Sequence, residues 1–337
     1  MTLLREKINY VITGVGIVGP FGTGRTVFRR QMEGDGQLPK SRGYAETERL
    51  QDFLTPRQLR RTDHFSQLAL TALYLALENA HLEPGDCQDG GLVVASGYGP
   101  LASACAFKDT FFENGALGAS PTTFTKSVHN QAASHIALQL GLRGPVATIC
   151  QHIMPFQHAL LTACLWLREK RVERVLVGGV DEFSSILRYS RSRYLAEGKK
   201  CDLAAFAKGG TVAAEGAAFF VLGKGRKAPD FPLLELPFFG NCPLQGGVMQ
   251  GDCIIVADGL AGAEYWPEGR VVDSGFNFRD FYGYFPTAAA LDLAAMTVPL
   301  ALHKKHQKIS HFEMGAMGRY GVLHLSSALK NNVNHIC

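Results

Sequence analysis

Hydrophobic positions in the middle of the chain follow two different spacings, and together they predict a strand, a helix and a second strand. A short apolar run at 146–150, rich in β-branched residues, is typical of a buried strand. Between 155 and 168, apolar residues recur every three or four positions and predict one helix face: Phe156, Ala159, Leu160, Ala163, Cys164 and Leu167. Pro155 suits the first helical position, where its missing N–H costs nothing. The apolar run 175–177, closed by two glycines, predicts the second strand.

The same spacings predict elements on both sides of this unit. Strands that lead into glycine turns are expected at 9–18 and 91–99, and helices at 53–82, 101–114 and 288–301. Strands that alternate with helices indicate an α/β fold. A polar, proline-containing segment at 224–230 changes the composition in the middle of the chain. This change predicts a boundary between residues 1–223 and a shorter part at 224–337, within one compact unit.

The first expected strand carries glycines with the GxGxxG spacing of dinucleotide-binding proteins. They are Gly14, Gly16 and Gly19. In dinucleotide-binding proteins a helix follows these glycines directly, and an acidic residue comes after the second strand. Here Pro20 and two further glycines interrupt such a helix, and no acidic residue stands at the required place. We therefore reject a nucleotide site and expect no cofactor.

Composition narrows the possible classes of function. The chain has 337 residues, is 46% hydrophobic and 19% charged, and carries a formal charge of +4, so it is expected to be globular. This weak positive charge does not argue for nucleic acid, but it is compatible with an acidic protein partner. The eight cysteines include no CxxC pair, so we expect neither a metal site nor disulfides, but free thiols in the cytoplasm. No apolar run is long enough to span a membrane.

The unit at 141–182 resembles the nucleophile-elbow segment of the β-ketoacyl synthases, the condensing enzymes of fatty-acid and polyketide synthesis. The resemblance rests on GLRGP and Thr148 before the turn, and on His158-Ala159 and the run GGVDE after it. A second segment, 206–222, resembles a glycine-rich turn and strand of this family, with Glu215 as its structural acid. The resemblance covers residues 8–223 and, more weakly, 250–330. It implies a thiolase-like fold, with five αβαβα layers built from two pseudo-repeats, the second shortened.

The three positions that carry catalysis in the family hold unsuited side chains here. Active members use a cysteine nucleophile and two histidines. The ungapped alignment of the elbow places Ile153 at the cysteine position, and the registers of two later motifs place Asp258 and Tyr284 at the histidine positions. The isoleucine side chain has no lone pair with which to attack a thioester. An aspartate in place of histidine would repel a carboxylate substrate. The resemblance therefore implies a subunit without catalytic residues, which is no enzyme on its own.

A family member without a nucleophile suggests a chain length factor, the non-catalytic partner of a catalytic ketosynthase in type II polyketide biosynthesis. The shortened second half favours aromatic, anthraquinone-like pathways, with aryl polyene or fatty-acid-like systems as the alternative. Acyl carrier protein is the second expected partner. Members of the family form dimers through the strand that is predicted here at 146–150. The expected interface residues are Val146, Ala147, Thr148, Ile149 and Cys150.

The helix expected at 101–114 corresponds to one that lines the end of the acyl tunnel in relatives that determine chain length. Ser103, Ala106, Phe107 and Thr110 fall on one face of it. The three small residues would leave room for a long chain, and Phe107 would stop it. Ordinary helix packing explains the same pattern equally well.

Two other functions stay open at this point. A ketosynthase-fold acyltransferase or hydrolase could use Cys150 with His152 or His158, although we expect Cys150 to be a buried strand thiol. A two-residue shift of the alignment would instead bring Gln151 to the elbow, but both flanks oppose it. The third function is a stand-alone acyl-binding or scaffold homodimer.

Overall fold

The computed structural model of the chain describes residues 9–32, 43–60, 62–196, 213–224, 232–241, 253–257, 282–302, 308–314 and 319–327. Its strands form one mixed sheet, in the order β4 (Val146–Cys150), β3 (Gly91–Ser96), β5 (Arg174–Asp181), β6 (Gly216–Lys224), β1 (Tyr10–Gly19), β7 (Leu233–Leu234), β11 (Arg319–Ser326), β10 (Lys308–Met314) and β9 (Cys253–Ala257). The short strands β2 (Gly22–Thr23) and β8 (Phe238–Asn241) pair with β1 and β11.

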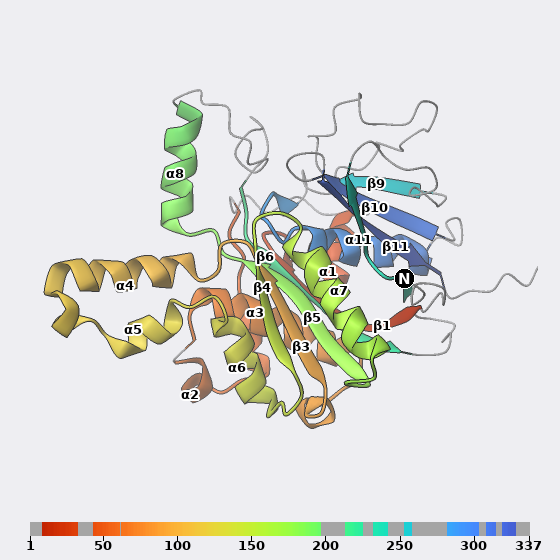
Figure 1. Cartoon of the computed structure of the whole chain (residues 1–337), viewed down its shortest axis with the longest axis horizontal. Coiled ribbons are helices and arrows are strands. Elements are labelled where there is room, and N and C mark those ends of the chain that lie inside the picture. The colour runs from red at the N-terminus through yellow and green to blue at the C-terminus, as the bar shows by residue number, and fades with distance from the viewer. Residues whose placement is uncertain are drawn as a thin grey trace, which may run out of the picture.

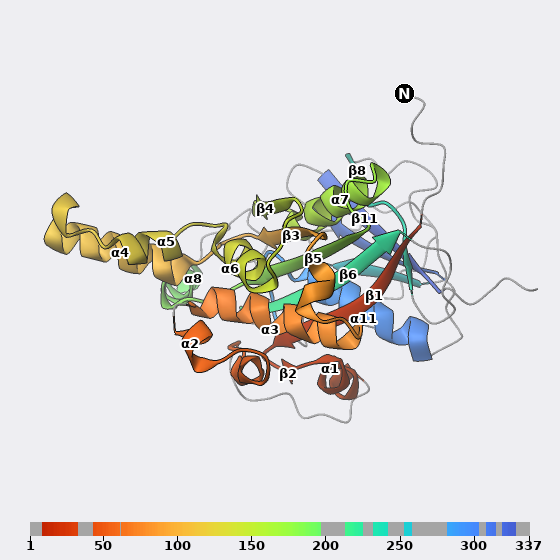
Figure 2. The same cartoon turned by 90° about the horizontal axis from the view of Figure 1, so that it is seen from below.

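Helices pack on both faces of the β1–β6 part of this sheet (Figures 1 and 2). One face carries α3 (His64–Asn79) and α6 (Gln131–Leu140), and the other carries α7 (Pro155–Arg168) and α11 (Ala289–Leu302). The remaining α-helices are α1 (Arg25–Met32), α2 (Pro56–Leu59), α4 (Leu101–Asn114), α5 (Pro121–Lys126) and α8 (Ser185–Ala196); short 3-10 turns η1 (Glu48–Asp52), η2 (Pro84–Cys87) and η3 (Ala116–Gly118) link some of them. Because α11 also contacts β10 and β11, α7 and α11 lie between the two parts of the sheet.

Alternating side chains of the central strands fill two separate hydrophobic cores. On β6, Phe220 and Leu222 face the core of α7 and α11, whereas Phe219 and Val221 face the core of α3 and α6. Successive residues of a strand point to opposite faces, so a strand covered on both sides must be apolar throughout. This requirement explains the continuous hydrophobic run of β6.

The glycines of β1 serve helix packing. The strand runs without a break through Gly19, so no helix opens at the GxGxxG spacing. A Cβ atom on Gly16 would lie 2.0 Å from the carbonyl oxygen of Ala72, and one on Gly14 would lie 2.3 Å from that of Ala76. Only glycine lets α3 approach the strand this closely. The expected turn after residue 18 therefore begins slightly later than the sequence indicates.

The two halves of the chain repeat one arrangement, as the family resemblance predicts. In the first half α7 precedes the antiparallel pair β5 and β6, and β3 runs parallel to β5. In the second half α11 precedes the antiparallel pair β10 and β11, and β9 runs parallel to β10. β7 pairs with both β1 and β11 and so joins the halves into one sheet. The exact boundary at 223/224 stays a prediction.

Most predicted elements are confirmed, with one clear error. The helix expected at 53–82 is broken, because α2 ends at Leu59 and α3 begins only after Asp63. The Asp63 carboxylate accepts a hydrogen bond from the backbone N–H of Ser66 at 2.8 Å. This is the interaction of an N-cap residue, so Asp63 starts a new helix.

Candidate functional site: the elbow and the pocket beside Tyr284

The turn between β4 and α7 has a conformation that few side chains adopt. Met154, the N-cap of α7, lies in the left-handed region with φ 52° and ψ 43°. Such a backbone is unfavourable for a residue other than glycine and persists where its surroundings enforce it. Pro155 then fixes the first helical position, as predicted. The turn is therefore a sharp, strained elbow between strand and helix.

The side chains of Gln151 and His158 contact the backbone of this elbow. The Gln151 side-chain amide donates a hydrogen bond to the carbonyl oxygen of Ile153 at 2.8 Å and lies 2.7 Å from Nδ1 of His158. The same ring nitrogen lies 2.8 Å from the carbonyl oxygen of Met154. Phe239 of β8 covers the His158 ring, with 4.3 Å between the ring centroids. Gln151 and His158 thus stabilise the backbone of the turn through these contacts.

Ile153 stands in the elbow directly before Met154 and is half-buried. The nearest thiol in sequence belongs to Cys150, whose Sγ lies 4.0 Å from the carbonyl oxygen of Gly97. The expectation of a buried thiol is wrong, because Cys150 is exposed at the end of an edge strand. Partial burial of its side chain, and then the nearby Asp181, raise the pKa of the thiol. A raised pKa disfavours the thiolate, which is the nucleophilic form.

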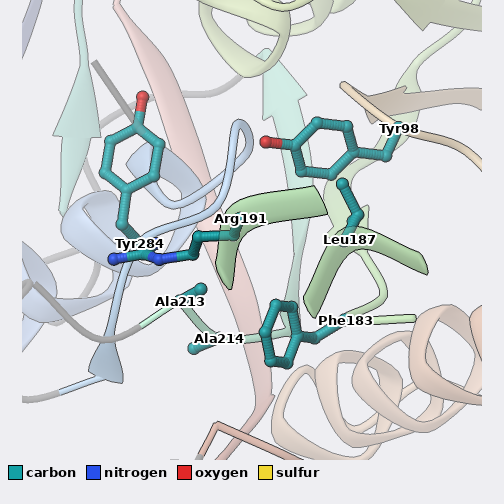
Figure 3. Close-up of a pocket in the computed structure, with 7 residues that line it drawn as sticks. All are labelled: Tyr98, Phe183, Leu187, Arg191, Ala213, Ala214 and Tyr284. Carbon is teal, nitrogen blue, oxygen red and sulfur yellow. The ribbon is translucent and has the colours of Figure 1, made fainter. Parts of the chain in front are cut away.

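Tyr284 lies in a small pocket formed by segments that are far apart in the sequence (Figure 3). Its backbone forms a bridge to Ala213, and the N–H of Ala214 donates to its carbonyl oxygen at 3.2 Å. The described lining consists of Tyr98, Phe183, Leu187, Arg191, Ala213, Ala214 and Tyr284. Asp258, the other predicted site residue from the second half, lies outside the described residues. The structure therefore places Tyr284 at a pocket, and Ile153 is not part of the described lining.

A fully buried carboxylate, Asp181, organises the backbone beside this pocket. One of its oxygens accepts hydrogen bonds from the Ser96 hydroxyl at 2.9 Å and from the backbone N–H groups of Gly97 and Tyr98 at 2.8 and 2.9 Å. The other accepts from the backbone and hydroxyl of Thr287 at 3.0 and 2.8 Å. Burial raises the pKa of Asp181, although these hydrogen bonds counteract it. Asp181 thereby ties β3 to the segment that carries Tyr284.

Glu215 plays a similar part, in agreement with its expected structural role. Its carboxylate accepts hydrogen bonds from the backbone N–H groups of Ala45 and Phe183, both at 2.8 Å, and lies 2.8 Å from Nε2 of His64. The neighbouring Glu182 accepts from the N–H of Ala102 at 2.7 Å. Asp181 and Glu182 were not predicted as organising residues. Their position directly at the end of a buried apolar strand was the available signal.

The four predicted tunnel residues lie on α4, which has no buried residue. The Ser103 hydroxyl donates to the Asp63 carboxylate at 3.2 Å, and Ala106 is exposed. The Phe107 ring packs against Phe124 of α5 at 5.4 Å, and the Thr110 hydroxyl donates to the carbonyl oxygen of Phe107 at 2.7 Å. None of the four lines the pocket beside Tyr284. Their role in a tunnel stays a prediction.

The predicted interface strand β4 lies at the edge of the sheet. Within the described residues it pairs only with β3, and Val146 is 43% exposed. Ala147, Thr148 and Ile149 are half-buried. An edge strand of this kind presents unpaired backbone groups to a partner. Its use as an interface stays a prediction.

Among the described residues, no group of three or more His, Cys, Asp or Glu side chains is placed to hold a metal ion. The helices in these parts of the chain are all too short or too polar to cross a membrane.

Several known proteins are similar to this chain in sequence. The chain is 26% identical over 209 residues to 3-oxoacyl-(acyl-carrier-protein) synthase 2 of Rhizobium meliloti, which covers 55% of this chain and 49% of that protein. The chain spans about half the length of the curated relatives it matches.

Solved structures match over nearly the whole chain. One is a type II polyketide synthase acyl-carrier protein in complex with its ketosynthase, with a TM-score of 0.74, 16% identity, and coverage of 95% of this chain and 100% of that one. Another is the ishigamide ketosynthase/chain length factor, with a TM-score of 0.72, 17% identity, and coverage of 95% and 99%. At these identities the likeness shows the ketosynthase-like thiolase fold. The family model for the β-ketoacyl synthase N-terminal domain matches residues 43–228, more than half of the sequence, and the chain therefore belongs to the β-ketoacyl synthase family.

Proposed function

We propose that the chain is a chain length factor, the non-catalytic partner of a catalytic ketosynthase. The observation that carries this proposal is the elbow, a strained turn in which Ile153, the residue that the alignment places at the nucleophile position, stands directly before Met154. A side chain without a lone pair forms no acyl-enzyme. Tyr284 at a histidine position, and Asp258 at the other in the sequence alignment, support the same conclusion.

The surface around β4 is suited to contact with a partner subunit. Helices α4 and α5 extend away from the body of the molecule as an arm (Figure 1). Large apolar side chains on the arm and on α6 are exposed to solvent: Phe111, Phe112, Leu117, Phe124 and Leu138. Burial of apolar surface is favourable by about 25 cal/mol per Å², and exposed apolar surface of this kind marks interaction sites. Together with the unpaired edge of β4, the arm suits a heterodimer with a ketosynthase.

The names of similar proteins support the pathway and the partners. One structural neighbour is a ketosynthase in complex with a type II polyketide acyl-carrier protein, and another is a ketosynthase/chain length factor. A curated relative is a putative polyketide β-ketoacyl synthase of Streptomyces halstedii. We propose aromatic, anthraquinone-like type II polyketides as the products, with aryl polyene or fatty-acid-like systems as the alternative. Acyl carrier protein would deliver substrate chiefly to the catalytic partner.

The arm would also close the acyl tunnel of the complex. Ala106 is exposed on α4, and the neighbouring Phe107 is fixed by its contact with Phe124. Across a two-fold interface this face of α4 would meet the partner. The small Ala106 side chain would leave space for the acyl chain, and Phe107 would block the chain from extending further. The variant Ala106→Phe should then shorten the product by one or more extender units, whereas the matched variant Ala102→Phe, one turn earlier and also exposed, should leave its length unchanged. Product mass measures both, and an unchanged product with Ala106→Phe contradicts the tunnel assignment.

The geometry gives less support to an enzyme that uses Cys150. Partial burial and the carboxyl of Asp181 raise the pKa of its thiol. His158 is engaged with Gln151 and with the carbonyl oxygen of Met154. The His152 ring instead packs near Tyr98, at 5.7 Å between ring centroids. A cysteine nucleophile requires an adjacent base or a lowered pKa.

The proposal is tested by co-expression with the ketosynthase encoded beside this chain. The ketosynthase is tagged, and co-purification is followed by product analysis with acyl carrier protein and a malonyl donor. We expect a heterodimer, with product only when both chains are present and unchanged product with Cys150→Ala. A homodimer that hydrolyses thioesters alone, and loses this activity with Cys150→Ala, would overturn the proposal. A stable, inactive homodimer that ignores the ketosynthase would favour an acyl-binding scaffold.

A further inference from the structure

The arm formed by α4 and α5 extends from a base that has few means to hold it (Figure 1). No residue of α4 is buried, so this helix contributes no side chain to the hydrophobic cores of the body. Gly99, two residues before α4, has a positive φ of 63°, which most other residues avoid. Pro100 follows as the N-cap of α4 and makes no side-chain cap hydrogen bond. Polar contacts of the first turn of α4 therefore do much to fix the arm.

Two acidic side chains of the body supply these contacts. The Glu182 carboxyl, directly after β5, accepts a hydrogen bond from the backbone N–H of Ala102 at 2.7 Å. The Asp63 carboxylate accepts one from the Ser103 hydroxyl at 3.2 Å. Glu182 thus takes the place of an N-cap side chain, although it comes from another part of the sequence. Because the first turn of α4 lies against Glu182, release of this turn would let water reach the carboxyl.

Side chains of several elements surround Glu182 at this base. Those that interact with it electrostatically are Asp63 before α3, His64 on α3, Cys105 on α4 and Glu215 before β6. On the two helices that meet here, Lys108 and Asp109 of α4 and Arg188 of α8 are exposed to solvent. Arg191 of α8 lines the pocket beside Tyr284. The base of the arm therefore brings three acidic groups together with one imidazole.

Opposing effects act on the ionisation of Glu182, and burial decides between them. The N–H of Ala102 and the positive end of the α4 dipole favour the carboxylate. Burial is nevertheless the largest effect and raises the pKa of Glu182 to about 7, with the carboxylates of Asp63 and Glu215 adding to the rise. A carboxyl whose pKa is higher in the held than in the released arrangement releases a proton when the arm is freed. The hold on α4 should therefore weaken as the pH rises toward about 7.

We propose that Glu182 is a proton-controlled anchor of the arm. With Glu182 protonated, the first turn of α4 is held against the body. Loss of this proton places a third negative charge beside Asp63 and Glu215, so the turn is released, Glu182 becomes hydrated, and the arm moves about Gly99. The inference concerns this chain alone and holds whether or not the arm binds a ketosynthase.

Hydrogen–deuterium exchange of the full chain at pH 6 and pH 8, corrected for the intrinsic effect of pH on exchange, tests the anchor. Peptides from α4 should exchange roughly tenfold faster at pH 8, the factor that follows from a pKa of 4.5 in the released and about 7 in the held carboxyl. They should also exchange before peptides from the buried helix α7, which separates release of the arm from global unfolding. Equal corrected rates of α4 at both pH values, or exchange of α4 and α7 together, would overturn the anchor.

Two substitutions of acidic residues separate Glu182 from other carboxyls. Glu182→Gln cannot ionise, so it should abolish the pH effect on the exchange of α4. Glu113→Gln is the matched control, because Glu113 is exposed on α4 itself, and it should retain the effect. The same pH effect in both variants would contradict the role of Glu182.

Two further measurements keep the test decisive if Glu182→Gln alters the fold, which circular dichroism reveals. In the unsubstituted chain, the corrected exchange rate of α4 should rise with pH and level off above about pH 7. The His64 imidazole lowers the pKa of Glu182, so His64→Gln should move this levelling to higher pH. A rate that is already level from pH 5 upward, or a levelling that His64→Gln leaves in place, would overturn the anchor. None of these measurements requires a ketosynthase.

Discussion

Glu182 shows how burial at a single residue makes the stability of this protein depend on pH. It is almost fully buried, and its carboxylate accepts a hydrogen bond from the N–H of Ala102 in the first turn of α4. Burial, as the largest cause, raises the pKa of Glu182 to about 7, and the carboxylates of Asp63 and Glu215 contribute to the rise. The folded protein therefore retains a proton that the unfolded chain releases at lower pH.

This difference predicts the direction of a pH effect. Between the ordinary pKa of 4.5 and the folded value of about 7, the folded state binds more protons than the unfolded state, so the contribution of Glu182 to the free energy of unfolding falls as pH rises through this window. Above it the contribution is constant. The fall should be roughly 3 kcal/mol. Urea unfolding at pH 5, 6, 7 and 8 measures this fall. Glu182→Gln should abolish it, whereas the exposed control Glu169→Gln should retain it. The same pH dependence of the free energy of unfolding in both variants would contradict the assignment.

At the scale of single elements, the sequence indicated the type of most helices and strands but not their limits or their neighbours. The apolar face of α7 and the bounds of α4 follow from helical periodicity and are confirmed. The helix expected at 53–82 failed, because apolar periodicity continues across the polar cap at Asp63 that starts α3. The exposure of Cys150 was also missed, since an edge strand and a central strand have the same local pattern.

The close contact of α3 with β1 yields a sharp prediction at this scale. Gly16→Ala should destabilise the protein by about 3 kcal/mol, because the added Cβ would lie 2.0 Å from the backbone oxygen of Ala72. Gly85→Ala is a matched control in a short 3-10 turn, where a Cβ meets no atom within 4 Å. It should change the free energy of unfolding by less than about 0.5 kcal/mol. Chemical denaturation measures both, and similar effects of the two substitutions would disprove the packing role of Gly16.

The arm formed by α4 and α5 gives a second prediction about an element. Phe112 is 75% exposed on this arm, and burial of such a side chain in an interface contributes about 2 kcal/mol. Phe112→Glu should therefore weaken co-purification with the ketosynthase by at least about tenfold. Tyr189→Glu on α8, where Tyr189 is 63% exposed, is the control and should bind normally. If both variants bind the partner equally well, the arm is not the interface.

The whole molecule combines the family fold with a strained elbow, at which we propose that Ile153 replaces the nucleophile. Strand order and the repeat of α7-β5-β6 in α11-β10-β11 depend on long-range pairing, which the sequence alone did not specify beyond the family resemblance. The pocket beside Tyr284 is a product of the same topology. Its walls come from the segment after β3, from α8 and the residues before it, from the segment before β6 and from the segment before α11, so no local spacing could have indicated it.

Intact-protein mass spectrometry of the complex tests the central claim most directly. This chain and its ketosynthase are incubated together with acyl-loaded carrier protein, the reaction is quenched, and the mass of each chain is measured. The non-catalytic account predicts an acyl adduct on the ketosynthase alone, with the mass of this chain unchanged. A stoichiometric acyl adduct on this chain that disappears with Cys150→Ala would show that it takes part in acyl transfer, and would contradict the account.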